Sequence, residues 1–216
     1  MVKIAASVLN ADFSKWQEWL PKLEEAKVDR IQWDIMDNKY VPNNGVDKKW
    51  LAELRNHTKI FFESHHMVKK PEEQVTEFAE MGSNMFIFHI ETTSEPLKLI
   101  EKIEEHGMKV GIAVNNQTPV EKIFPYLDKV DLALVMTVEA GFGGQSFVEK
   151  NLEKVKALRK KIDSEKLDCK IEVDGGIDAK TGALCVASGV DVLVSGSGIF
   201  KHPKGIAEAV KELHKS

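Results

Sequence analysis

The stretch K-I-E-V-D-G-G, Lys170 to Gly176, has the pattern of a short buried strand that ends on an acid and two glycines. Glu172 and Asp174 are two residues apart, so their side chains share one face of that strand. Gly175 and Gly176 let the backbone turn, or let it approach a ligand closely. An acid at the carboxyl end of a strand, before a flexible turn, is where α/β barrels carry their functional groups.

Strand patterns and helix patterns alternate on both sides of this stretch. Strands are predicted at residues 2–9, 29–36, 59–68, 84–91, 109–115, 131–138, 169–174 and 190–195. Helices are predicted at 13–26, 48–56, 71–81, 95–106, 147–164, 179–188 and 202–215, with a short one opened by Pro119. Strict alternation predicts a parallel sheet. A doubly wound sheet is the alternative, but its glycine fingerprint after the first strand is missing. Eight such units predict a (β/α)8 TIM barrel, with residues 1–216 as a single domain.

The composition narrows the class of protein. The 216 residues are 43% hydrophobic, enough for one sizeable core, and the formal net charge of −4 gives no indication of a nucleic-acid partner. The two cysteines, Cys169 and Cys185, resemble neither a disulfide framework nor a metal-binding pair. No apolar leader and no apolar run of membrane length is present, so we expect a soluble, cytoplasmic protein without a membrane partner.

Polar residues stand at nearly every predicted strand end, where a barrel keeps its functional groups. In the second strand, Gln32, Asp34 and Met36 alternate onto the inner face. A buried acid such as Asp34 must be paired or coordinated, and backbone or lysine partners are the alternative to a functional role. In the third strand His65 shares the inner face, as a candidate ligand or an ordinary polar residue, while His66 points outward. The other polar strand ends are Ser7, His89, Asn115 and Asp174, and the eighth strand ends at Gly196 with Ser197.

Three glycine clusters follow the sixth, seventh and eighth strands. Backbone N–H groups at such turns, with a short helix beginning near Ser197, can hold an anion. The loops after strands seven and eight are the usual phosphate site of this barrel, although each cluster alone also suits a tight turn. The predicted phosphate-binding residues are Gly141, Phe142, Gly143, Gly144, Gly175, Gly176, Gly196 and Ser197.

Methionines also stand at three strand ends: Met36, Met67 and Met136. Their spacing alone favours adaptable core filler. A polarisable pad that excludes water above a reactive intermediate is the other interpretation.

Together these motifs resemble the ribulose-phosphate 3-epimerase family over essentially the full chain. The stretches that carry the resemblance are S-V-L-N-A-D-F from Ser7, D-I-M-D-N-K-Y-V-P-N from Asp34, H-H-M from His65, V-M-T-V-E-A-G-F-G-G-Q from Val135, E-V-D-G-G-I from Glu172 and V-S-G-S-G-I-F from Val194.

The resemblance implies an isomerase of carbohydrate metabolism, a metal-dependent 3-epimerase that usually converts D-ribulose 5-phosphate to D-xylulose 5-phosphate in the pentose phosphate pathway. Asp34 and Asp174 match the two catalytic acids, and inversion through a planar enediolate needs one such group on each face. A divalent ion (Zn2+, Mn2+ or Fe2+ in the family) would stabilise the developing charge. Ser7 matches a substrate contact, and the match makes the three methionines substrate-binding residues. It also implies a homo-oligomer.

The metal ligands implied by the family are His, Asp, His and Asp. Asp34, His65 and Asp174 fit the last three, whereas Gln32 replaces the first histidine. An amide oxygen is neutral, binds zinc more weakly and suits harder ions, so the site could hold zinc weakly, prefer Mn2+ or Mg2+, or hold no ion. Further departures near the mouth are Asn10, Asn38-Lys39, Glu63, His66, Asn116 and Ala140.

Other functions remain open at this point. The enzyme could epimerise a different ketose phosphate, such as a hexulose 6-phosphate. A different phosphate-barrel lyase or isomerase is a second alternative, although the related decarboxylases carry D-x-K-x-x-D and this chain has only D-I-M-D-N-K from Asp34. A sugar-phosphate-binding protein without turnover would use the glycine loops and not the acids.

Overall fold

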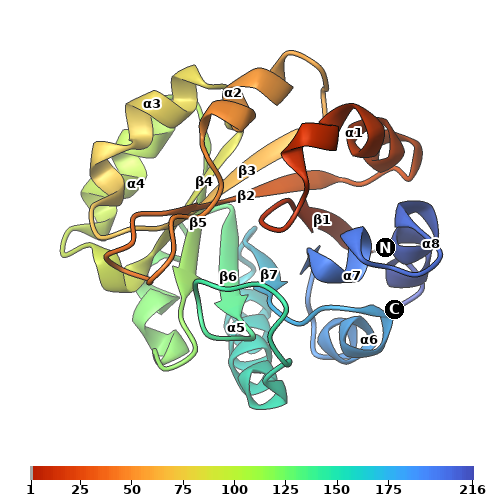
Figure 1. Cartoon of the computed structure of the whole chain (residues 1–216). Helices are drawn as coiled ribbons and strands as arrows, with labels where there is room; N and C mark the ends of the chain where they lie inside the picture. Colours follow the sequence, from red (N-terminus) through yellow and green to blue (C-terminus); the bar gives the residue numbers. More distant parts are fainter. Residues whose placement is uncertain (1) are drawn as a thin grey trace.

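The structure, a computed structural model, describes residues 2–216. Within that range, eight parallel strands pair in chain order and close into a barrel, with helices around the outside (Figure 1). The predicted (β/α)8 barrel is confirmed. The strands are β1 (Lys3–Ser7), β2 (Arg30–Met36), β3 (Phe61–Met67), β4 (Met85–His89), β5 (Lys109–Val114), β6 (Leu132–Met136), β7 (Lys170–Asp174) and β8 (Val192–Ser195).

The helices follow the predicted alternation. They are α1 (Trp16–Glu25), α2 (Lys49–Arg55), α3 (Val75–Glu80), α4 (Pro96–Glu105), α5 (Leu152–Glu165), α6 (Ala179–Ala187), α7 (Ser197–Phe200) and α8 (Ile206–Leu213). Short 3-10 helices also occur: η1 (Phe13–Lys15), η2 (Pro71–Glu73), η3 (Ile90–Thr92), η4 (Val120–Tyr126) and η5 (Glu149–Asn151). None of the helices in the described residues has the length and apolar character needed to cross a bilayer.

Four helices differ from their prediction. Those expected from Phe13 and Pro71 begin as the 3-10 helices η1 and η2, and become α-helical at Trp16 and Val75. The helix expected to open at Pro119 is the 3-10 helix η4, which contains Pro125; proline lacks the N–H that an α-helical hydrogen bond requires. The long helix expected from Phe147 begins as η5 and becomes α-helical at Leu152. Val148 N instead donates to Thr137 O at 2.8 Å, which ties this segment to the end of β6.

The register between β2 and β3 places the polar residues of the two strands side by side. Asp34 pairs with His65, and Gln32 pairs with Glu63. Because paired residues of parallel strands point to the same side of the sheet, all four side chains enter the barrel interior. Across the barrel, β7 brings in Asp174, which pairs with Met136 of β6.

The apolar core lies between the strands and the helices, and includes the fully buried Trp33, Phe62 and Phe86. His66 belongs to this outer layer, as predicted. Its ring stacks on Phe86 with centroids 3.6 Å apart, and its Nδ1 lies 2.7 Å from Gln74 Oε1.

The barrel interior beneath the mouth is charged. Arg30 Nη1 donates to Glu63 Oε2 at 2.8 Å and lies 3.3 Å from Glu172 Oε2. Both carboxyl groups are fully buried, and burial raises the pKa of each. Arg30 therefore joins β2, β3 and β7 directly below the residues that line the mouth.

Candidate active site

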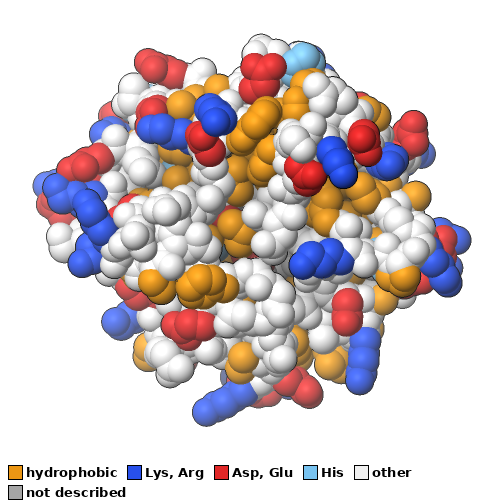
Figure 2. All heavy atoms as spheres, viewed as in Figure 1, with side chains coloured by type: hydrophobic (Ala, Val, Ile, Leu, Met, Phe, Trp, Pro, Cys, Tyr) orange, Lys and Arg blue, Asp and Glu red, His pale blue; other side chains and the backbone are white. Residues whose placement is uncertain are grey.

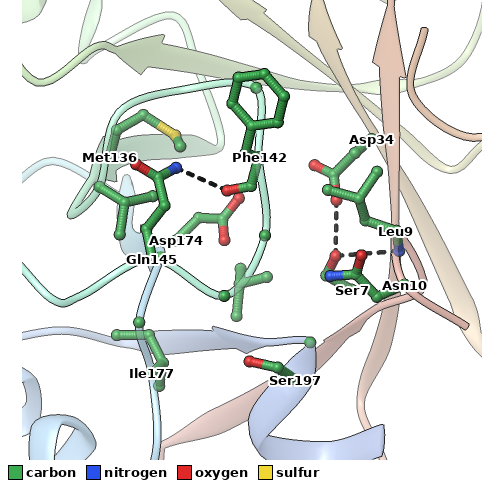
Figure 3. Close-up of a pocket in the computed structure, with 18 of the residues that line it drawn as sticks. Ser7, Leu9, Asn10, Asp34, Met136, Phe142, Gln145, Asp174, Ile177 and Ser197 are labelled. Atoms are coloured by element: carbon green, nitrogen blue, oxygen red, sulfur yellow. Dashed lines mark hydrogen bonds between the residues drawn. The ribbon is translucent and has the colours of Figure 1, made fainter. Parts of the chain in front are cut away.

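A pocket opens at the carboxyl ends of the barrel strands. Its wall brings together nearly all of the predicted site residues: Ser7, Asp34, Met36, Met67, Met136, Gly141, Phe142, Gly143, Gly144, Asp174, Gly175, Gly176, Gly196 and Ser197 (Figure 3). Gln32 and His65 are fully buried and hydrogen-bond to the two acids of that wall. On the face shown in Figure 2, acidic and basic side chains are interspersed and lie mostly toward the periphery.

Asp34 and Asp174 stand on different sides of the pocket (Figure 3). Asp34 Oδ2 accepts a hydrogen bond from Ser7 Oγ at 2.7 Å. Gln32 Nε2 donates to Asp34 Oδ1 at 3.0 Å and to Asp174 Oδ2 at 2.9 Å. His65 Nδ1 lies 3.1 Å from Asp34 Oδ1 and 3.6 Å from Asp174 Oδ2. The Asp174 side chain keeps 17% of its surface exposed, against 3% for Asp34, so the pocket reaches Asp174 more readily.

The surroundings raise the pKa of Asp174 and the pKa of His65. Burial, followed by the nearby charge of Asp34, raises the pKa of Asp174 to about 7. Burial disfavours the charged form of His65, but the hydrogen bond and charge of Asp34 outweigh it and raise the pKa of His65. A carboxyl group that titrates near neutral pH can both accept and donate a proton, as general acid–base chemistry requires.

The buried end of the site fits a divalent cation. Asp34, His65 and Asp174 each offer one ligand atom, and these atoms all lie within 4.8 Å of one another. Gln32 Oε1 is buried and has no hydrogen-bond partner among residues 2–216. Such an atom is the kind that cation coordination satisfies. Two carboxylates, an imidazole and an amide oxygen together form a donor set suited to borderline and hard ions.

His65 also hydrogen-bonds to a group that the sequence did not assign to the site. Its Nε2 lies 2.9 Å from His89 Nε2, and His89 Nδ1 lies 3.2 Å from Glu91 Oε2. Tyr40 Oη approaches the same His89 nitrogen at 3.3 Å. His89 was expected only as a polar strand end. Glu91 was expected as the last residue of the fourth strand but lies in η3, and Tyr40 lies in the loop after β2, which has no strand periodicity to predict where its side chain points.

The backbone conformation and the close packing at the pocket leave no room for a side chain at Gly176. Gly176 has φ +68°, and a Cβ there would lie 2.7 Å from Phe147 N. Nearby, Gln145 Nε2 donates to Glu139 O at 2.6 Å and to Phe142 O at 2.7 Å, which folds the G-F-G-G loop back on itself. Gln145 has no predicted role because the loop's fold is not periodic. Leu9, Val138, Ile177 and Val194 also line the pocket without having been predicted, and Asn10, expected near the mouth, lines it too.

Comparison with known proteins extends these observations. Residues 3–200 match the model of the ribulose-phosphate 3 epimerase family. The ribulose-phosphate 3-epimerase of Escherichia coli K12 is 38% identical over 216 residues, covering 98% of this chain and 96% of the relative. That of Schizosaccharomyces pombe is 37% identical over 217 residues, covering 99% and 93%.

Among solved structures, KGPDC from Streptococcus mutans superposes with a TM-score of 0.74. It is 16% identical and covers 100% of this chain and 96% of that one. A 3-hexulose-6-phosphate synthase from Salmonella typhimurium gives a TM-score of 0.69 at 16% identity, covering 99% and 97%. At these identities the likeness concerns the barrel fold alone.

Proposed function

The chain belongs to the ribulose-phosphate 3-epimerase family, and from this premise we propose that it interconverts D-ribulose 5-phosphate and D-xylulose 5-phosphate by inverting C3. The observation that carries the proposal is the placement of Asp34 and Asp174 on two sides of one pocket whose remaining wall includes the glycine clusters. Inversion at a carbon next to a carbonyl group requires a proton carrier on each face of the planar intermediate.

In this proposal one of the two acids removes the C3 proton, and the other returns a proton to the opposite face. Their roles exchange in the reverse reaction. The pKa of Asp174 near 7 suits it to alternate between carboxylate and carboxylic acid. Asp34 is held by the hydroxyl of Ser7 and by Gln32, which fixes its carboxylate toward the pocket.

Asp34, His65, Asp174 and the Oε1 atom of Gln32 would hold a divalent cation. When bound, that ion supplies positive charge beside the developing enediolate oxygens. Because Gln32 contributes a neutral oxygen where an imidazole nitrogen would bind zinc strongly, we propose a preference shifted toward Mn2+ or Mg2+.

The remaining wall of the pocket would bind the rest of the substrate. The phosphate lies against the backbone of Gly141–Gly144, Gly175–Gly176 and Gly196–Ser197, because backbone N–H groups at such turns favour an anion. Met36, Met67 and Met136 line the pocket and are almost fully buried. They would cover the planar intermediate and exclude water from it, while the Ser7 hydroxyl contacts a substrate hydroxyl.

A direct test measures conversion of D-ribulose 5-phosphate, and exchange of the C3 proton with deuterated solvent, in the presence of Mn2+, Mg2+ or Zn2+. Asp34→Asn and Asp174→Asn should each lower turnover by roughly 10²–10⁴-fold. Asp163→Asn, on the exposed side of α5, is the matched control and should keep full activity.

The alternatives give different results in the same assay. Absence of turnover with every cation would overturn the pentulose proposal. Faster turnover of a hexulose 6-phosphate would reassign the substrate. Tight binding of the phosphosugar without C3 exchange would indicate a binding protein.

A further inference from the structure

A chain of hydrogen bonds leads from His65 away from the pocket. His65 lies on β3, His89 at the end of β4, and Glu91 in η3. The two imidazole Nε2 atoms are 2.9 Å apart, and the ring centroids are 5.1 Å apart at an interplanar angle of 21°. The rings therefore meet nearly edge to edge in one plane, with an N–H of one aimed at the nitrogen lone pair of the other. Both histidines are fully buried, so water does not replace either partner.

The Glu91 end of this hydrogen-bond chain fixes which atom donates in each of its bonds. A carboxylate only accepts hydrogen bonds, so the contact between Glu91 Oε2 and His89 Nδ1 requires a proton on Nδ1. A neutral His89 that carries this proton has a lone pair on Nε2. That lone pair can only accept from an N–H on His65 Nε2. Asp34 Oδ1, 3.1 Å from His65 Nδ1, competes for the same proton. Neutral His65 keeps that proton on Nε2 only while His89 accepts it there, and its lone pair then lies on Nδ1, the nitrogen that faces Asp34 and Asp174.

Glu91 is itself fixed in place. Its Oε1 accepts a hydrogen bond from Asn115 N at 2.9 Å, and Tyr40 Oη donates to its Oε2 at 3.4 Å. Lys154 Nζ donates to the carbonyl oxygens of Asn115 and Asn116 at 2.9 and 2.7 Å, which anchors that loop. The carboxylate is thus held by loops that follow β2 and β5, and cannot turn away from His89 without breaking these contacts.

We propose that His89 and Glu91 are positioning residues, which hold neutral His65 in its Nε2–H form and so aim the Nδ1 lone pair into the cation site. This inference rests on the cation site of the proposed function. Without the pair, neutral His65 would place its proton on Nδ1, where Asp34 Oδ1 at 3.1 Å accepts it. A proton there blocks the lone pair that a cation needs.

The tautomer can be measured on metal-free protein with isotope-labelled histidine, by NMR at alkaline pH, where imidazole is neutral. The wild-type protein should show His65 protonated at Nε2. His89→Leu should move that proton to Nδ1. His89→Gln should restore the wild-type signature, because the amide oxygen can accept from His65 while the amide nitrogen donates to Glu91. His66, buried on the outer face of the same strand, serves as the reporter of an intact fold.

Cation affinity gives a second readout. His89→Leu should weaken Mn2+ binding by about tenfold to a hundredfold. Glu91→Gln, at a partly exposed side chain, should weaken it less, because an amide can either donate or accept. His66→Leu removes an equally buried histidine and should leave Mn2+ binding unchanged.

Retention of the Nε2–H form in His89→Leu, or an Nδ1–H form in the wild-type protein, would overturn the proposal. Equal losses of Mn2+ affinity in His89→Leu and His66→Leu would also overturn it, since both would then reflect general destabilisation. If wild-type protein binds no Mn2+, the proposed cation site fails, while the tautomer measurement still decides the role of His89.

Discussion

Gln32 donates its side-chain amide to Asp174 Oδ2 across the barrel at 2.9 Å, and the same nitrogen lies 3.0 Å from Asp34 Oδ1. The two amide hydrogens can serve both carboxylates at once. A neutral side chain therefore joins the two acids that we propose as proton carriers. Its oxygen is buried and without a partner among the described residues, so turning the amide over would present this oxygen, in place of the nitrogen, to a cation held by the two acids.

Replacing Gln32 by histidine should increase zinc affinity by about tenfold or more, because imidazole nitrogen is a stronger zinc ligand than an amide oxygen. Competition with a chromophoric chelator measures the change. Gln32→Leu is the complementary variant and should bind both zinc and Mn2+ more weakly than the wild type. Wild-type affinity in Gln32→Leu would show that the amide oxygen is not a ligand.

The raised pKa of Asp174 predicts a pH-dependent stability of the metal-free protein. An unfolded aspartate titrates near pH 3.9, whereas burial and Asp34 raise the pKa of Asp174 to about 7 in the fold. The folded protein binds this proton more tightly, so the contribution is fully present below about pH 4 and is lost as pH rises to about 7. Asp174→Asn cannot ionise, so its melting temperature relative to wild type should rise across this range. A difference that stays constant with pH would contradict the assignment.

Arg30 is predicted to stabilise the folded barrel beneath the pocket. Arg30→Met leaves Glu63 and Glu172 buried without their cation, which should lower the free energy of unfolding by about 3–5 kcal/mol. Denaturant unfolding measures this change. Adding Glu63→Gln and Glu172→Gln to the same protein should recover part of the loss, because neutral amides need no counter-charge.

A surface pair provides the comparison for Arg30. Lys156 Nζ lies 2.8 Å from Glu153 Oε1, and both side chains are more than half exposed. Lys156→Met should therefore leave the unfolding free energy nearly unchanged. An equally small effect of Arg30→Met would show that the buried network is not a stabilising element.

Gly176→Ala should weaken substrate binding. The added Cβ would meet Phe147 N at 2.7 Å, so the loop must shift from its present position, and KM should rise by about tenfold, equivalent to ~1.4 kcal/mol. Steady-state kinetics with the phosphorylated ketose measure this change. Gly107→Ala is the control, with φ +75° and no atom within 4 Å of its Cβ. Both variants should lose about 1–2 kcal/mol of stability from the left-handed backbone, but only Gly176→Ala should change KM.

Local sequence patterns were sufficient to predict the barrel. Strand and helix periodicities depend on residues that are neighbours in the chain, and strict alternation leaves few ways to arrange a parallel sheet. Because the carboxyl ends of the strands in a barrel meet at one face, Asp34, His65 and Asp174 could be placed at a common mouth from their strand positions. Two of the departures, at Pro119 and Phe147, fell where proline and a loop contact override the helical pattern.

The sequence by itself thus determined the fold and the chemical groups that face the mouth. Only the tertiary structure decided how these groups pair. Gln32 and Asp174 are separated by 142 residues, as are Arg30 and Glu172, and His65 reaches His89 across 24. Closure of the barrel brings these partners within hydrogen-bond distance, because strand register and the burial of each side chain fix its position against strands remote in the chain. No periodic pattern in one segment records such a contact.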